Sequence, residues 1–185
     1  MTHYDTILVG ATALALGYAH RAEAEGRHCA VIEAGCICIP EVSAAWSGKA
    51  YTADHRYSEG AASFLREMEQ RGICREKQPA YPEMGPLAAK WFDHTGCDVW
   101  FLSRVTEVSR EADVWNLTVS TIGGSFFITS DHLLDTTPDF DLHWFFGESA
   151  PKGTLSLTVA AENGFDFLPV PEGHSMAEAR AAVWE

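Results

Sequence analysis

The first 33 residues constrain the fold more than any other part of the sequence. An apolar run at residues 6–9 ends at Gly10, an Ala-rich segment occupies residues 13–26, and a second apolar run at residues 29–32 ends at Glu33. Continuously apolar strands are typical of parallel sheets that are covered on both faces. The pattern of strand, tight turn, helix and strand therefore predicts a βαβ unit within an α/β fold.

The rest of the chain predicts two more helices and a run of strands. Apolar residues at helical spacing predict helices over residues 58–71 and 83–94, and the small and turn residues of 35–60 indicate a loop. Strands are predicted at 98–102, 104–108, 114–121, 125–129, 132–135 and 154–159, with a hairpin turn at Gly123-Gly124 and a last helix that begins at Ser175.

Composition excludes several classes of function. The 185 residues carry 13 Lys and Arg against 26 Asp and Glu, a net charge of −13 that repels phosphate backbones and anionic lipids, so we expect neither nucleic acid nor membrane as a partner. No segment approaches the ~20 apolar residues of a membrane span, and the N-terminus lacks the features of a signal peptide. Five cysteines, an odd number, indicate reduced thiols, and we expect a cytoplasmic protein.

The turn after the first strand has the spacing of a dinucleotide-binding turn. Gly10, Thr12 and Ala15 occupy the three positions where such turns place glycine. Alanine is tolerated at the third position, whereas the β-branched side chain of Thr12 is expected to lie where a phosphate should approach. Glu33 follows at about the ~20 residues expected of the acidic group that binds a ribose hydroxyl. Dinucleotide binding and a βαβ unit with an unused turn remain equal alternatives on these residues.

Five segments between residues 4 and 141 follow the order of motifs in one known family. They are an opening strand at 4–10, a second strand with its acidic end at 29–35, a segment at 96–108, a hairpin at 115–129, and a strand at 133–139 with an Asp-Thr-Thr-Pro-Asp end. In this order they resemble the FAD-dependent oxidoreductases of the glutathione-reductase-like type, which have two dinucleotide-binding domains.

The resemblance implies a fold, a domain division and a cofactor. The fold class is α/β, a three-layer FAD/NAD(P)-binding Rossmann-like domain with a parallel sheet and a β-meander. Residues 1–141 would form the FAD-binding domain, and residues 142–185 an incomplete C-terminal extension. The implied FAD-binding residues are Gly10, Thr12 and Ala15 at the pyrophosphate, Glu33 at the ribose, Val105 at the adenine, and Asp135 and Asp139 near the ribityl phosphate.

The implied function is that of an FAD-dependent oxidoreductase of unknown substrate, with no catalytic residue assigned. Thr12, Ala15, Thr136 and Pro138 depart from the family's motifs, so a degenerate, non-catalytic binding or scaffold module is the alternative. An NAD-binding domain is a third interpretation, and the meander and the Asp135 segment argue against it. Family members are much longer, so the chain resembles their N-terminal part or a truncated relative, and we expect no turnover by the chain alone.

Two further clusters have alternative interpretations. Cys36 and Cys38 are too close in sequence for an easy disulfide, so a structural role is favoured over a redox or metal site, and no metal is expected. The apolar cluster Trp144-Phe145-Phe146 either packs in the core or forms an interface with a missing domain or a second copy of the chain.

Overall fold

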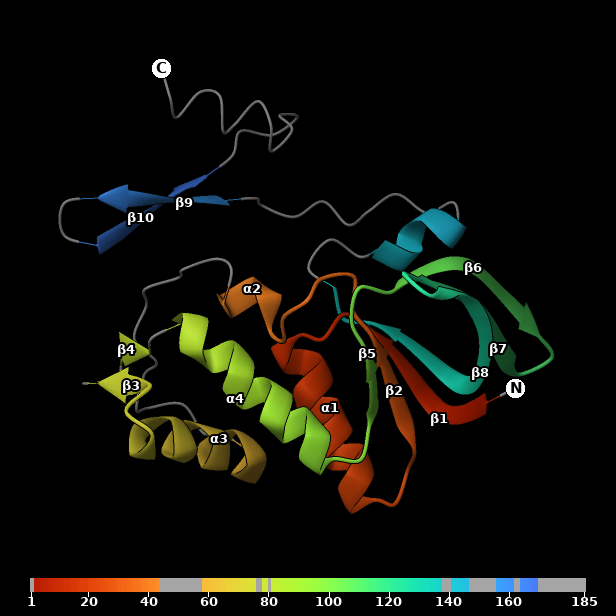
Figure 1. Cartoon of the computed structure of the whole chain (residues 1–185), viewed down its shortest axis with the longest axis horizontal. Helices are drawn as coiled ribbons and strands as arrows, with labels where there is room; N and C mark the ends of the chain where they lie inside the picture. The colour runs from red at the N-terminus through yellow and green to blue at the C-terminus, as the bar shows by residue number, and fades with distance from the viewer. Residues whose placement is uncertain are drawn as a thin grey trace.

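Strand β1 (Thr2–Val9) lies inside a six-stranded sheet. The computed structural model describes residues 2–43, 58–75, 78–79, 81–137, 141–146, 156–161 and 164–169. The sheet order is β5-β2-β1-β8-β7-β6 (Figure 1), with β2 at Cys29–Ile32, β5 at Asp98–Trp100, β6 at Arg104–Glu111, β7 at Val114–Thr121 and β8 at Gly124–Asp135.

Four neighbouring strands run parallel, as the βαβ pattern predicts. Val9, the last residue of β1, pairs with Ile32 at the end of β2 and with Asp135 at the end of β8. Strand β5 adds to the outer edge of β2, where Ile32 pairs with Trp100. The carboxyl ends of these strands consequently meet at one edge of the sheet.

The β-meander continues the same sheet with antiparallel strands. Strands β6, β7 and β8 pair in succession, and Thr121 pairs with Gly124. The hairpin turn is therefore Ile122-Gly123, one residue before the predicted Gly123-Gly124, because Gly124 is already the first residue of β8. The two strands predicted at 125–129 and 132–135 are instead one strand, β8. Its first half pairs with β7 and most of its length pairs with β1, so two partners hold it extended through the residues between the predicted pieces.

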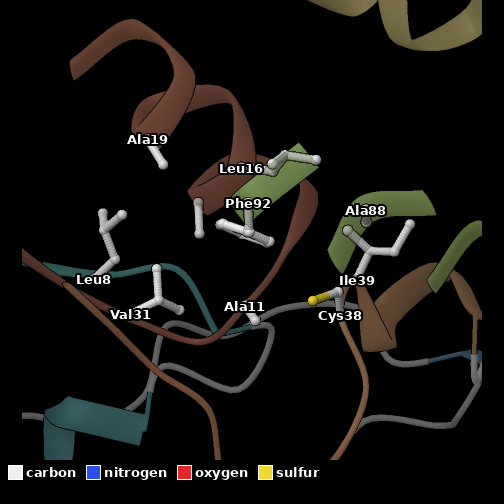
Figure 2. Packing of buried hydrophobic residues seen from close by; sticks show 10 residues of the cluster. Leu8, Ala11, Leu16, Ala19, Val31, Cys38, Ile39, Ala88 and Phe92 are labelled. Atoms are coloured by element: carbon white, nitrogen blue, oxygen red, sulfur yellow. The ribbon is translucent and has the colours of Figure 1, made fainter. Parts of the chain in front are cut away.

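Helices cover one face of the parallel strands and the meander covers the other. They are α1 (Ala13–Ala24), α2 (Pro40–Ser43), α3 (Glu59–Gln70) and α4 (Tyr81–His94). Leu8 and Val31 pack with Phe92 of α4 on the helical side (Figure 2), whereas Ile7 packs with Leu117 of the meander on the other. These three layers confirm the predicted α/β, Rossmann-like fold class.

Several predicted boundaries change in the structure. Helix α2 lies within the segment predicted to be a loop, and α4 begins at Tyr81 rather than at Glu83. The late predicted strand is β9 (Ser156–Ala161), which pairs with β10 (Gly164–Pro169), and the remaining short elements are β3 (Cys74–Arg75), β4 (Gln78–Pro79) and the 3-10 helix η1 (Asp141–Phe146). The helix predicted from Ser175 lies outside the described residues. In the described part, no helix is both long and apolar enough to cross a membrane.

Replacing Phe92 with alanine tests the core between the helices and the sheet. The Phe92 side chain is 1% exposed, so Phe92→Ala should leave a cavity that lowers the free energy of unfolding by about 3–5 kcal/mol. Leu14→Ala is the control, since Leu14 on α1 is 69% exposed and its loss should change stability by no more than about 0.5 kcal/mol. Urea unfolding measures both; similar losses in the two variants would contradict this description of the core.

Candidate functional site

A pocket of about 360 Å³ opens where β1 and β2 end. Its walls come from the turn after β1, the end of β2, the start of β6 and helix η1. Strand β2, which follows β1 in the sequence, pairs with one side of β1, and β8 pairs with the other side. This change of direction in the strand order makes the edge a topological switch point. Ligands of open α/β sheets bind outside the carboxyl ends of the strands at such a point. Four predicted site residues line the pocket: Gly10, Thr12, Glu33 and Val105.

Gly10 allows the turn to pass close to the end of β8. Its φ angle is +95°, and a Cβ atom at this position would lie 2.9 Å from Cγ2 of Thr137. The Thr136 hydroxyl lies 2.8 Å from the carbonyl oxygens of both Val9 and Gly10 and donates to them. Glycine is therefore required here by both backbone conformation and space.

Thr12 and Ala15 both serve helix α1. Thr12 is the N-cap residue, and its hydroxyl oxygen accepts a hydrogen bond from the Ala15 amide at 3.2 Å. Ala15 is fully buried in the core with Leu8 and Val31 and does not line the pocket. The structure thus brings Thr12 to the pocket and places Ala15 behind it, at the contact between helix and strands.

The Glu33 carboxylate is fixed by two backbone amides. Its Oε2 accepts from the Ala11 amide at 2.7 Å, its Oε1 accepts from the Gly35 amide at 2.6 Å, and the residue is 6% exposed. An ionised carboxylate has about four acceptor positions, so roughly two remain after these bonds. Glu33 is therefore a preorganised acceptor for hydroxyl groups within the pocket.

Residues 103–105 form the wall opposite the turn. The Ser103 amide donates to the Glu33 carbonyl at 3.0 Å, which holds the start of β6 against the end of β2. The pairing of β6 with β7 shifts register between Val105 and Glu107, and such bulges redirect neighbouring side chains. Ser103 and Arg104 line the pocket beside Val105, and no motif in the sequence indicated them.

Asp135 shapes the pocket without lining it. Its Oδ1 accepts from the amide of Thr137 at 2.9 Å and from the hydroxyl of Thr137 at 2.6 Å, and its Oδ2 accepts from the Leu142 amide at 2.7 Å. These bonds join β8 to η1, whose Trp144 and Phe145 complete the wall. Asp139 lies outside the described residues.

Glu41 is a second carboxylate at the turn, and no motif in the sequence indicated it. Its Oε1 accepts from the amide of Ala13, the first residue of α1, at 2.6 Å, whereas its Oε2 is buried without a hydrogen-bond partner. Burial raises the pKa of Glu41; the amides of Ala13 and of Glu41 itself oppose this shift, and the charge of Glu33 adds to it. The sequence signal that could have predicted α2 is Pro40, because proline is common as the first residue of a helix.

The cysteines of the loop after β2 differ in accessibility. Cys36 is exposed, and Cys38 is 2% exposed in the core beneath the turn. Burial raises the pKa of Cys38 to about 11, and the charge of Glu33 contributes to the shift. Among the described residues, no group of three or more His, Cys, Asp and Glu could hold a metal ion.

Solved structures share this fold at low sequence identity. A flavoprotein/dehydrogenase from Cytophaga hutchinsonii is 16% identical, with a TM-score of 0.60 over 83% of this chain and 44% of that one. The p-nitrophenol 4-monooxygenase of Pseudomonas putida is 12% identical, with a TM-score of 0.58 over 99% and 62%. The bacillithiol disulfide reductase of Staphylococcus aureus is 15% identical, with a TM-score of 0.58 over 76% and 40%.

Sequence comparison adds no family. No protein-family model and no curated protein sequence matches the chain. The chain spans less than two thirds of the length of each of these three structures. The structural likeness establishes the fold, which is a Rossmann-like α/β fold that this chain shares with these structures.

Neutralising Glu41 should stabilise the protein at neutral pH. When the pKa of a carboxyl in the folded protein lies above its ordinary value of 4.5, the free energy of unfolding falls as the pH rises from 4.5 to the folded pKa. The loss persists at higher pH. Glu41→Gln removes the charge and keeps an oxygen for the Ala13 amide, so its free energy of unfolding should exceed that of the wild type at about pH 7. The difference should shrink at about pH 4, where the wild-type carboxyl is mostly neutral in both states.

Urea unfolding of both proteins at the two pH values measures this difference. Glu59→Gln is the matched control, because Glu59 is an exposed carboxylate in the first turn of α3. Equal or lower stability of Glu41→Gln at neutral pH would show that the charge of Glu41 is not costly.

Proposed function

We propose that this chain is the flavin-binding domain of an FAD-dependent oxidoreductase and that the pocket between the β1 turn, Glu33 and Val105 holds the FAD. One observation carries the proposal: the pocket lies at the switch point of a Rossmann-like sheet and contains a buried carboxylate with unused acceptor capacity. The similar structures, a flavoprotein/dehydrogenase, a monooxygenase and a disulfide reductase, support redox chemistry for proteins of this fold.

The residues of the pocket fit the nucleoside end of such a ligand. Glu33 would accept hydrogen bonds from ribose hydroxyls, and Val105 would provide an apolar contact for the adenine. Gly10 and Thr12, at the start of α1, would lie near the pyrophosphate, because helix N-termini favour anions. Asp135 would act indirectly, by holding η1 against the pocket.

The bound flavin would supply the hydride chemistry, and the protein would position it. The residues of this chain would bind the nucleotide and exclude water with the apolar side chains of η1, namely Leu142, Trp144 and Phe145. The substrate and the electron acceptor would be set by groups outside this pocket. Because the chain spans less than two thirds of the length of the similar structures, turnover would also require parts that those longer chains possess.

A non-catalytic module is the second candidate. It is favoured by the side chains that already occupy amides of the turn: Glu33 on Ala11, Glu41 on Ala13, and Thr12 on Ala15. A turn with satisfied amides can be stable without any nucleotide. The visible absorption spectrum of the purified protein distinguishes the two candidates. A flavin band supports the flavoprotein, and a colourless protein that does not take up added FAD supports the module.

Removing the Glu33 carboxylate should weaken FAD binding. Charge-assisted hydrogen bonds to two ribose hydroxyls contribute about 1.5 to 3 kcal/mol each, so Glu33→Ala should lower the affinity by about tenfold or more. Flavin fluorescence titration measures the affinity, and circular dichroism checks the fold because the amides of Ala11 and Gly35 lose their acceptor. Glu111→Ala, at the exposed end of β6, is the control. Unchanged affinity in Glu33→Ala would remove Glu33 from the site.

We also propose that the protein is cytoplasmic. The aromatic cluster of η1, Trp144-Phe145-Phe146, would contact a further domain or a second copy of this chain. Trp144 is 78% exposed and Phe146 is 46% exposed, an unusual exposure for large apolar side chains on one helical turn. Trp144→Ser should reduce self-association measured by light scattering. Phe127→Ser is the control, because Phe127 is 63% exposed on the meander. A monomeric wild-type chain would contradict self-association and leave the further domain as the partner.

A further inference from the structure

The turn after β1 uses its own carboxylates where a phosphate-binding turn offers amides. Helix N-termini bind phosphate because their first amides lack partners within the helix and carry partial positive charge. In this chain the Ala13 amide, the first of α1, donates to Glu41 at 2.6 Å. A phosphate that approaches the start of α1 therefore meets a carboxylate on one of the amides it would use.

The charges around the turn strengthen this competition. The Glu33 carboxylate accepts a hydrogen bond from the Ala11 amide of the same turn. The carboxylates of Glu33 and Glu41 therefore both lie near the start of α1. Of the basic residues within the described ranges, Arg104 alone lines the pocket, and its side chain is exposed. An incoming phosphate would be repelled by both carboxylates and attracted by a single solvated guanidinium.

The position of Glu41 is also costly to the protein. Its Oε2 is buried without a hydrogen-bond partner, although most buried polar atoms in proteins have one. Ile39, two residues earlier, has φ +48°, a conformation that is rare for β-branched residues, and its amide donates to the Ala11 carbonyl at 2.6 Å. The unpaired Oε2 of Glu41 and the backbone strain at Ile39 both lower the free energy needed to move residues 39–41 away from the turn.

We propose that Glu41 competes with the ligand phosphate for the Ala13 amide. Glu41 must leave this amide before a phosphate-bearing nucleotide binds at the turn. This inference rests on the proposed function, because Glu41 and Ala13 lie next to the pocket residues Pro40 and Thr12, although they do not line the pocket themselves. It assigns to Glu41 control over affinity for the phosphate part of the ligand and leaves the nucleoside part to Glu33. The raised pKa of Glu41 is consistent with a carboxylate held in an unfavourable place.

Titration of three related ligands tests this role. FAD, ADP and adenosine are titrated by calorimetry into the wild type, Glu41→Gln, Glu41→Ala and the control Glu59→Gln. Loss of one charge-assisted hydrogen bond should tighten binding of FAD and ADP by roughly tenfold in Glu41→Ala and by less in Glu41→Gln, which keeps a neutral acceptor. Adenosine, which has no phosphate, should bind all four proteins alike, and Glu59→Gln should match the wild type for every ligand.

The outcomes separate this inference from the proposed function. Nucleotide binding by the wild type that is not tightened in either Glu41 variant overturns the competition and leaves the FAD pocket standing. An equal gain for adenosine also overturns it, because Glu41 would then restrict the pocket in general. If none of the four proteins binds any of the ligands, the proposed function fails and this inference fails with it.

Hydrogen exchange of the Ala13 amide provides a measurement without ligand. Measured by NMR, this amide should exchange more slowly in the wild type than in Glu41→Ala, because Glu41 is its acceptor. The Glu59→Gln control should keep the protection of the wild type. Equal exchange in the wild type and Glu41→Ala would show that the contact does not persist in solution and would overturn the inference.

Discussion

The parallel pairing of β1 with β2 on one side and β8 on the other is the constraint on which the rest of the structure depends. Because Val9 pairs with both Ile32 and Asp135, three strand ends meet at one edge, and the turn, the carboxylate of Glu33 and the β8 end become neighbours. The close approach of Gly10 to Thr136 and Thr137 follows from this pairing. The pocket thus lies where ligands of open α/β sheets bind, outside the carboxyl ends of the strands at a switch point.

Carboxylate side chains accept several of the hydrogen bonds at this edge. The carboxylates of Glu33, Glu41 and Asp135 accept from backbone amides of the turn, the following loop and η1. Satisfying these amides is important because a buried donor without a partner costs about 1–3 kcal/mol. Glu33 and Asp135 hold the edge together in the absence of a ligand, whereas the charge of Glu41 is held there at a cost. Glu33 and Glu41 both oppose a phosphate at the start of α1.

The far wall of the pocket depends on contacts between segments distant in sequence. The amide of Ser103 bonds to the carbonyl of Glu33, and the bulge after Val105 bends β6 beside it. Asp135 holds the Leu142 amide, which brings the aromatic side chains of η1 to the opposite rim. Each contact joins the end of one strand to the start of another element, so a change in strand register would open the pocket.

The sequence by itself determined the α/β class, the βαβ unit, the hairpin of residues 114–129 and the grouping of Gly10 with Glu33. These features follow from local patterns: apolar runs, turn glycines and an acidic residue at the end of a strand. Only the tertiary structure decided the continuity of β8, the short helix α2, the placement of Ala15 in the core and the contact between Glu41 and the start of α1. The physical reason is that hydrogen bonds between residues such as Ala13 and Glu41 depend on where the chain returns in space, and local patterns carry no information about that distance.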